Sequence, residues 1–427
     1  MGILKLKPAC KDYLWGGHRL VDEYGVQYDG DVCAEAWVLS CHPDGPSTIV
    51  NGKYAGRTLQ QFIDAEGKEV LGTNCRRFRE FPILTKFIDA KQNLSIQVHP
   101  DNAYALKNEN QYGKTEMWYV IDAEPGAFLY YGFKKEISRE EFEERIKNNT
   151  LTEVLNAVHV KKGDALLIES GTLHAIGAGI LIAEIQQNSN VTYRVYDYGR
   201  IGKDGKPREL HIAKALDVTK REPAEPKSSY PHIADCDYFT VDKINLNGST
   251  TDKVSGEVGE ESFLSILVLD GEGKISCGDD KMDYRKGDSF FLPAGSGKWK
   301  MKGSADVLLT TVRAKKNPIT IQIKLSSDLA VSPANLTADI HLVKEDGSEA
   351  GRKKFVTDGE KGCAGRAVEA ALKLLDETKT PLDQCTLMEV SIEDAAIQSH
   401  AINKDFDLLE NELGRIAKIP VSVKAAE

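Results

Sequence analysis

The 427-residue sequence has no run of apolar residues long enough to cross a bilayer as a helix, which takes about 18 residues. Its first eleven residues mix apolar and basic side chains and lack the apolar segment of a secretory signal peptide. Basic residues are not in excess either, because the net charge is −10 at pH 7. This argues against a general nucleic-acid or anionic-membrane binder, but it allows a local basic pocket for a small phosphorylated ligand.

The eight cysteines are scattered and include no Cys-x-x-Cys pair. This excludes a zinc ribbon and argues against a disulfide framework, so we expect reduced thiols in a cytoplasmic protein. Core-forming residues are plentiful, since 41% of the chain is hydrophobic and 28% is charged. Such proportions are typical of a soluble globular protein, and the length suggests two or three domains.

Ligand-type side chains are concentrated around the segment Ser-Ile-Gln-Val-His at residues 95–99. Gln97 and His99 are two residues apart, so a strand would present both side chains on one face. Glu116 and His174 each lie beside another strand-like run. A single histidine near a strand is more often structural. Two imidazoles, a carboxylate and an amide oxygen in order nevertheless suit a divalent cation such as zinc, with one position left for water or substrate.

The first 220 residues are expected to be mainly β-structure, because short apolar or alternating runs are bounded by Gly, Pro, Asn or Asp. Six runs predict strands: 34–40, 81–89, 94–98, 116–122, 165–169 and 180–186. One helical insertion, at about 136–157, interrupts them. Ser138 precedes Glu140 and Glu141 in a capping-box arrangement, and a second short helix is expected at 151–155.

An internal repeat is visible between residues 162–174 (KGDALLIESGTLH) and residues 286–298 (KGDSFFLPAGSGK). Each copy begins with Lys-Gly-Asp, continues with a mainly apolar strand and ends in a glycine-bearing turn. The repeat predicts two related β-barrels in tandem. The second copy has Lys298 where the first has His174, so we expect it to lack the metal and to be structural.

We therefore expect three domains, with boundaries at 1–220, 231–313 and 318–427. The Pro- and charge-rich segment 220–230 reads as the linker between the first two. The last domain should be an α/β extension, because strand-like runs alternate with helical spacing. Its expected strands are 319–323, 338–343, 387–390 and 420–423, and its expected helices are 364–375 and 406–416.

Seven short blocks now define a resemblance that covers about residues 1–313. They are YLWGG at 13–17, EAW at 35–37, LTKF at 84–87, SIQVHP at 95–100, KTEMW at 114–118, GTLHA at 171–175 and TYRV at 192–195. In content and order they resemble type I mannose-6-phosphate isomerase (phosphomannose isomerase) in its shorter bacterial form. The resemblance implies an enzyme with a cupin-type β-barrel that interconverts mannose 6-phosphate and fructose 6-phosphate and uses one zinc ion per chain.

The resemblance also assigns roles by position: four metal ligands, an active-site arginine and three phosphate-binding side chains. The ligands are Gln97, His99, Glu116 and His174; the arginine is Arg194; the phosphate-binding residues are Lys86, Ser95 and Lys114. None of these positions departs from the family pattern.

These side chains suit an aldose–ketose isomerisation, in which a proton moves between C1 and C2 through a cis-enediol. Negative charge develops on the two oxygens, where a metal ion acting as a Lewis acid and the two-pronged guanidinium of Arg194 can stabilise it. The identity of the general base stays open. A carboxylate, a lysine or a metal-bound hydroxide could serve, and Asp197, Glu184 and Lys114 are all near in sequence.

Residues 318–427 resemble, more weakly, the first lobe of a ROK-family sugar kinase. The phosphate-binding Asp-Gly-Gly-Thr turn of that family is replaced by KLSSD at 324–328, and its Glu-Asn-Asp by Lys-Ala-Ala at 424–426. We therefore expect an accessory or oligomerisation domain, through which the chain could form a homo-oligomer, and no kinase activity.

Two rival functions are weighed against the isomerase. An iron-dependent cupin dioxygenase would require a His-rich facial set, and Gln97 preceding His99 by two residues argues against it. The other rival is a catalytically inactive sensor of sugar phosphates, against which the complete ligand set and Arg194 argue.

Overall fold

The computed structural model describes residues 2–202, 205–226, 229–247, 251–315, 318–327, 336–344, 347–357, 363–380, 382–393 and 406–425. Two compact units are recognised, residues 1–73 with 81–313 and residues 74–80 with 314–427. Within the described ranges, no helix is long and apolar enough to span a membrane.

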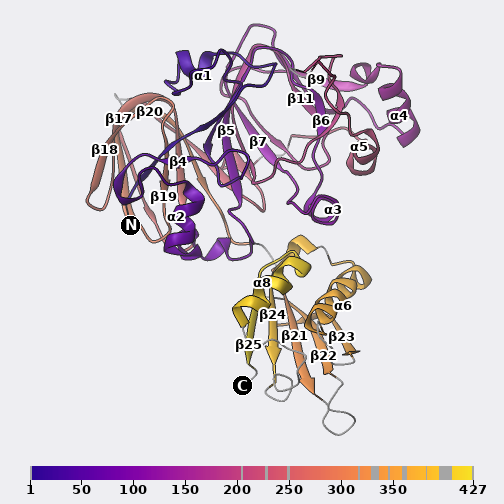
Figure 1. Ribbon diagram of the computed structural model, residues 1–427. Coiled ribbons are helices and arrows are strands. Elements are labelled where there is room, and N and C mark those ends of the chain that lie inside the picture. The colour runs from indigo at the N-terminus through magenta and orange to yellow at the C-terminus, as the bar shows by residue number, and fades with distance from the viewer. Residues whose placement is uncertain are drawn as a thin grey trace. The chain divides into compact units, whose positions relative to one another are not determined.

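The first unit contains two antiparallel sheets that carry all the predicted site residues on or next to their strands (Figure 1). The six-stranded sheet has the order β10-β7-β12-β5-β3-β2. Its strands are β2 (Ala9–Lys11), β3 (Glu35–Leu39), β5 (Ile83–Ala90), β7 (Glu116–Ala123), β10 (Ala165–Ile168) and β12 (Ile180–Gln187). The five-stranded sheet has the order β13-β6-β11-β8-β9. Its strands are β6 (Ile96–Val98), β8 (Phe128–Phe133), β9 (Leu155–His159), β11 (His174–Ile176) and β13 (Tyr193–Tyr196).

These two sheets pack face to face through one apolar cluster. Ile88 and Val120 of the six-stranded sheet are buried there together with Leu129 and Ile176 of the five-stranded sheet. Over the described residues the hydrogen-bonded strand order of each sheet is open, so the two sheets pack as a sandwich and the expected barrel does not close by hydrogen bonds. The mainly β, cupin-type fold is confirmed, and all six predicted strands are present with ends shifted by at most a few residues.

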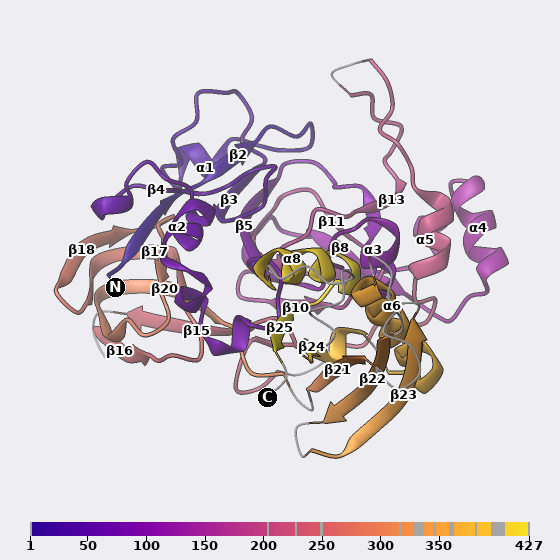
Figure 2. The same cartoon turned by 60° about the horizontal axis from the view of Figure 1, so that its bottom comes forward.

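The other face of the five-stranded sheet is covered by helices α4 (Arg139–Lys147) and α5 (Ile212–Val218), which lie beside each other in both views (Figures 1 and 2). Phe142 and Ile146 of α4 are buried against the sheet, as their spacing predicts. The second predicted helix is only one 3-10 turn, Leu151–Glu153. The chain then enters β9, because Leu155 pairs with Phe133 and the ladder of the sheet prevails over local helical spacing.

Ser138 caps α4, since its hydroxyl accepts a hydrogen bond from the Glu141 amide. Ser138→Ala should destabilise this helix by about 1 kcal/mol, whereas Ser138→Asp should not, because a carboxylate can accept the same bond. Hydrogen exchange of the α4 amides measures the difference. Equal protection in the alanine variant and the wild type would show that packing alone fixes the helix.

A nine-stranded antiparallel sheet holds the second copy of the repeat. Its central order is β14-β15-β20-β17-β19-β1-β4, with β16 on β20 and β18 on β17. The strands are β1 (Leu4–Lys7), β4 (Thr48–Ile49), β14 (Ala234–Asp235), β15 (Thr240–Asn247), β16 (Lys253–Val258), β17 (Leu264–Cys277), β18 (Asp280–Arg285), β19 (Ser289–Leu292) and β20 (Gly297–Thr311). Two strands from the N-terminal region therefore complete a sheet that otherwise comes from residues 234–311. The expected division near residue 220 stays a prediction.

The Lys-Gly-Asp frame forms the same turn in both copies. Gly163 and Gly287 have φ values of +94° and +89°, which a residue with a side chain rarely adopts. In each copy the aspartate then accepts a backbone amide three residues earlier, Asp164 from Lys161 and Asp288 from Arg285. The turn that the repeat predicts is confirmed.

Further short helices lie around the sheets of the first unit. They are α1 (Arg19–Asp22), α2 (Leu59–Glu66) and α3 (Asn102–Asn108), with 3-10 turns at Gly52–Tyr54 and Lys68–Leu71. Helix α3 follows the metal-ligand segment directly, and Asp101 caps it by accepting the Tyr104 amide.

The second unit is a five-stranded mixed sheet in the order β23-β22-β21-β24-β25, in which β24 runs parallel to β21 and β25. Its elements are β21 (Ile319–Ser327), β22 (Leu336–Lys344), β23 (Glu349–Thr357), α6 (Cys363–Thr378), β24 (Cys385–Ile392), α8 (Phe406–Ala417) and β25 (Val421–Ala425). Alternate residues of β21 are buried beneath α6 and α8, whereas Gln322 and Lys324 are exposed. The α/β extension is confirmed. Asp328 and residues 426–427, where the kinase motifs are replaced, lie outside the described residues.

Candidate metal centre and cleft

The register of the five-stranded sheet places three predicted site residues in one row. His174 of β11 is directly opposite Gln97 of β6, and Arg194 of β13 is opposite the same Gln97 on its other side. Glu116 begins β7 in the facing sheet, and His99 immediately follows β6. Residues that are far apart in the sequence therefore meet between the two sheets.

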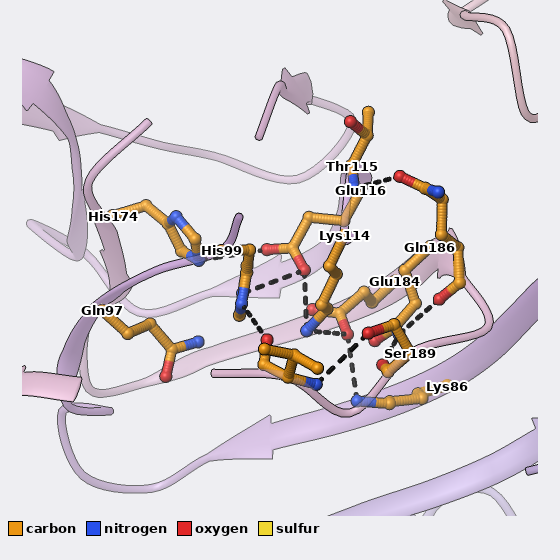
Figure 3. Close-up of polar contacts among 12 residues, drawn as sticks. Lys86, Gln97, His99, Lys114, Thr115, Glu116, His174, Glu184, Gln186 and Ser189 are labelled. Carbon is orange, nitrogen blue, oxygen red and sulfur yellow. Dashed lines mark hydrogen bonds and ion pairs between the residues drawn. The ribbon is translucent and has the colours of Figure 1, made fainter. Parts of the chain in front are cut away.

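His99, Glu116 and His174 are fully buried and offer ligand atoms within 4.8 Å of one another. The Nε2 atom of His174 lies 3.2 Å from Glu116 Oε1, and that of His99 lies 3.6 Å from Oε2. Figure 3 shows Gln97 beside the two imidazoles. The four predicted ligands thus lie together.

The orientation of both imidazoles suits metal binding. Each Nδ1 lies 2.8 Å from a backbone carbonyl, Val191 for His99 and Thr172 for His174. A carbonyl can only accept, so each Nδ1 carries the proton and donates it. Each Nε2 then presents a lone pair to the centre of the group, which is the arrangement that fixes metal-bound histidines.

The ligand atoms lack hydrogen bonds that would satisfy them. In the described part of the chain, no hydrogen bond reaches either Nε2 or either carboxylate oxygen of Glu116, although Lys114 forms an ion pair with one of those oxygens. Burial lowers the pKa of His99 well below its usual range and that of His174 to about 4. Burial also raises the pKa of Glu116 to about 7. A divalent cation would satisfy all three side chains, so they fit the implied metal.

A chain of buried ion pairs extends from Glu116 across the six-stranded sheet (Figure 3). Lys114 Nζ lies 2.9 Å from Glu116 and 3.7 Å from Glu184, and Lys86 Nζ lies 3.2 Å from Glu184 and 3.4 Å from Glu35. The indole N–H of Trp118 also donates to Glu184. Although burial acts to raise the pKa of Glu184, Lys114 and Lys86 lower it to about 2, so this carboxylate is ionised at neutral pH.

A cleft of about 250 Å³ opens beside the metal centre. It is lined by Tyr13, Trp15, Glu35, Lys86, Ile88, Leu94, Ser95, Gln97, Lys114, Trp118, Ile176, Glu184, Asn190, Thr192, Arg194 and Arg208. Arg194 reaches into this lining while donating to Ser95 Oγ at 3.2 Å and to the carbonyl of Glu209 at 3.0 Å. The cleft therefore brings together Arg194 and the three residues expected to bind phosphate.

Sequence reasoning did not identify some cleft residues as functional. Glu35 and Trp15 belong to blocks that carried the resemblance, but no role was assigned to them. Arg208 and Asn190 gave no signal, since they lie in loops whose path depends on the rest of the fold. Asp197, a candidate general base by its position in the sequence, accepts hydrogen bonds from Arg200 and Arg208 and is not among the lining residues.

Comparison with known proteins accounts for this architecture. Residues 3–123 match the family model of the phosphomannose isomerase type I catalytic domain, and residues 230–312 match that of the mannose-6-phosphate isomerase cupin domain. The mannose-6-phosphate isomerase ManA of Bacillus subtilis is 38% identical over 319 residues, which are 72% of this chain and 98% of that protein. The mannose-6-phosphate isomerase of Streptococcus mutans is 38% identical over 314 residues, 71% of this chain and 96% of that protein.

A solved structure shows the same relationship. The crystal structure of the Bacillus subtilis mannose 6-phosphate isomerase superposes with a TM-score of 0.66 at 37% identity, covering 73% of this chain and 99% of that one. The match thus spans nearly the whole of each relative and leaves more than a quarter of this chain outside it. On this similarity, the chain is an isomerase that belongs to the type I phosphomannose isomerase family.

Proposed function

We propose that this protein interconverts mannose 6-phosphate and fructose 6-phosphate by moving a proton between C1 and C2 through a cis-enediol, with one zinc ion per chain. The observation that supports this most directly is the buried group of His99, Glu116 and His174, whose ligand atoms converge beside a cleft of sugar-phosphate size. Zinc suits this mixed set of nitrogen and oxygen ligands, with Gln97 as the fourth. Bound there, the cation would supply Lewis-acid stabilisation of the developing oxyanion.

Arg194 is proposed to stabilise the same charge from the protein side. Its guanidinium lines the cleft and is always cationic at neutral pH, so it can donate to the C1 and C2 oxygens as negative charge develops. Ser95 and the Glu209 carbonyl hold two of its nitrogens before substrate arrives. Such preorganisation means that little reorientation is needed during the reaction.

Lys86, Ser95 and Lys114 are proposed to attract and hold the phosphate. Both lysines are buried and already paired with carboxylates, so alone they provide little net positive charge. With a divalent cation bound, however, the positive charge of the two lysines and the metal exceeds the negative charge of Glu35, Glu116 and Glu184. We therefore expect the phosphorylated substrate to bind the metal-loaded protein more tightly than the metal-free one.

We narrow the set of candidates for the general base without assigning one. Asp197 accepts hydrogen bonds from Arg200 and Arg208 and does not itself line the cleft, whereas Glu184 and Lys114 both line it. Proton transfer requires the base to be within hydrogen-bonding reach of the substrate carbon, directly or through one water. Glu184 is accordingly the carboxylate that we retain as a candidate. Lys114 could serve as the base only if it did not hold the phosphate on C6, and a metal-bound hydroxide stays open as well.

A coupled assay tests the proposed function. Protein stripped with a chelator should form no fructose 6-phosphate from mannose 6-phosphate, and added zinc should restore turnover. Calcium, which prefers sets made only of oxygen ligands, serves as the control cation. Absence of turnover with any divalent ion, from protein shown to be folded and metal-loaded, would contradict the isomerase and favour the sugar-phosphate sensor.

We further propose a cytoplasmic location, from the scattered cysteines, and a homo-oligomer formed through the C-terminal unit. Size-exclusion chromatography with light scattering would test the second proposal.

A further inference from the structure

Arg194 lies on a strand that has a neighbour on one side only. Strand β13 is at the edge of the five-stranded sheet, with β6 as its partner. The ladder is irregular between Arg194 and Tyr196, so the backbone of Arg194 is not held by a regular run of strand pairs. Its outer edge must find other partners, because edge backbone groups left unpaired are unfavourable when buried.

His211 provides those partners. Its backbone amide donates to the Arg194 carbonyl at 2.8 Å, and its imidazole Nδ1 lies 3.4 Å from the Arg194 amide, from which it accepts. His211 thus provides hydrogen-bond partners for both the carbonyl and the amide of Arg194, as a neighbouring strand would do. The ring also lies 6.1 Å from that of Tyr193, the residue before Arg194.

The position of His211 is itself fixed from several directions. It is the N-cap residue of α5, and its carbonyl accepts the first bond of that helix from the Ala215 amide. Helix α5 is in turn tied to α4, because Arg139 donates to the Leu216 carbonyl at 2.7 Å. The imidazole makes no capping bond to its own helix, so its described hydrogen bond serves Arg194 and not α5.

The segment that leads into His211 also holds the side chain of Arg194. The carbonyl of Glu209, two residues before His211, accepts from Arg194 Nη1. Arg208 is fixed by Asp197, to which it donates through two nitrogens at 2.8 and 2.6 Å. Residues 208–211 therefore contact both the backbone and the guanidinium of Arg194.

We infer that His211 is a positioning residue for Arg194: its imidazole, acting as an acceptor for the Arg194 amide, holds the guanidinium in the cleft for the isomerisation. The inference rests on the proposed function for the role of Arg194. His211 does not line the cleft, so it acts through Arg194 and not by touching the substrate.

Two substitutions separate this role from simple packing. His211→Ala removes the acceptor, whereas His211→Asn keeps an acceptor oxygen close to the place of Nδ1. Because a misplacement of about 1 Å can lower a rate by roughly 100-fold, we expect His211→Ala to lower kcat by about 10-fold or more with a smaller change in KM. His211→Asn should recover most of the lost kcat. His232→Ala is the matched control, since that imidazole also makes a hydrogen bond through Nδ1, to Asp242.

A measurement that needs no turnover makes the test independent of the proposed function. In hydrogen exchange followed by ¹⁵N–¹H spectra of the full chain, the Arg194 amide should lose protection in His211→Ala and keep near-wild-type protection in His211→Asn. Wild-type protein without turnover would contradict the isomerase, and the amide protection would still decide the inference. Unchanged protection of the Arg194 amide in His211→Ala, or an asparagine variant as slow as the alanine variant, would overturn the positioning role.

Discussion

Replacement of His174 by alanine is expected to weaken zinc binding by at least about 100-fold and to remove turnover with it. Loss of a residue that only orients a metal ligand already costs 10–100-fold in affinity, and His174 is expected to be a ligand itself. The alanine leaves a buried gap opposite Glu116, whose carboxylate oxygens accept no hydrogen bond from the described residues. Isothermal titration with zinc, metal analysis of the purified protein and the coupled assay measure the three consequences.

His159→Ala is the matched control for this substitution. His159 lies on β9 of the same five-stranded sheet, but it is exposed and away from the ligand group. It should keep wild-type affinity and rate. Wild-type zinc affinity in His174→Ala would contradict the ligand set.

Thermal stability gives a second measure of the same site. A ligand that binds only the folded protein stabilises it by about 4 kcal/mol at a concentration 1,000 times its Kd. Zinc should therefore raise the Tm of the wild type and of His159→Ala, but hardly that of His174→Ala. The chelated proteins should differ much less from one another, because the comparison then no longer includes the binding energy of the metal.

The convergence of the candidate ligands could be predicted because local sequence contains most of the information about their placement. The two-residue spacing of Gln97 and His99 gives their side chains a common direction at the end of β6. A buried carboxylate that faces a buried imidazole between two packed sheets is rarely placed for packing alone. The Lys-Gly-Asp turns were equally predictable, since Gly163 needs a positive φ that the sequence satisfies by itself.

The ion-pair network could not be predicted in the same way, because cross-strand register decides it. Lys86 meets Glu184 only because β5 and β12 pair with these two residues opposite each other. A shift of one residue would turn one of them to the other face. Long-range pairing likewise places β1 next to β19. The pairing of Leu155 with Phe133 starts β9 directly after one 3-10 turn, where a second helix is expected. The contact between His211 and Arg194 also depends on long-range packing, because it joins the N-terminus of α5 to the edge of a sheet. It is therefore visible only in the structure.

Arg194→Lys is expected to lower kcat by about 100- to 1,000-fold while leaving the fold intact. Lysine keeps the positive charge, but it cannot donate two bonds in a fixed plane to the developing enediolate. Removal of one preorganised donor to an oxyanion typically has an effect of this size. Steady-state kinetics with mannose 6-phosphate measure it, and the zinc content should remain that of the wild type because Arg194 is not among the proposed ligands.

The comparison of kcat with KM shows whether the guanidinium of Arg194 stabilises the transition state or the bound substrate. If Arg194 stabilises charge that exists only in the transition state, kcat and kcat/KM fall together, whereas loss of a contact to the ground state raises KM alone. Arg145→Lys is a matched control, because Arg145 lies on α4 and pairs with Glu153, far from the cleft lining. A lysine variant with wild-type kcat would show that charge alone suffices at this position. The proton transfer would then depend on the metal and the Glu184–Lys114 pair without a directed guanidinium.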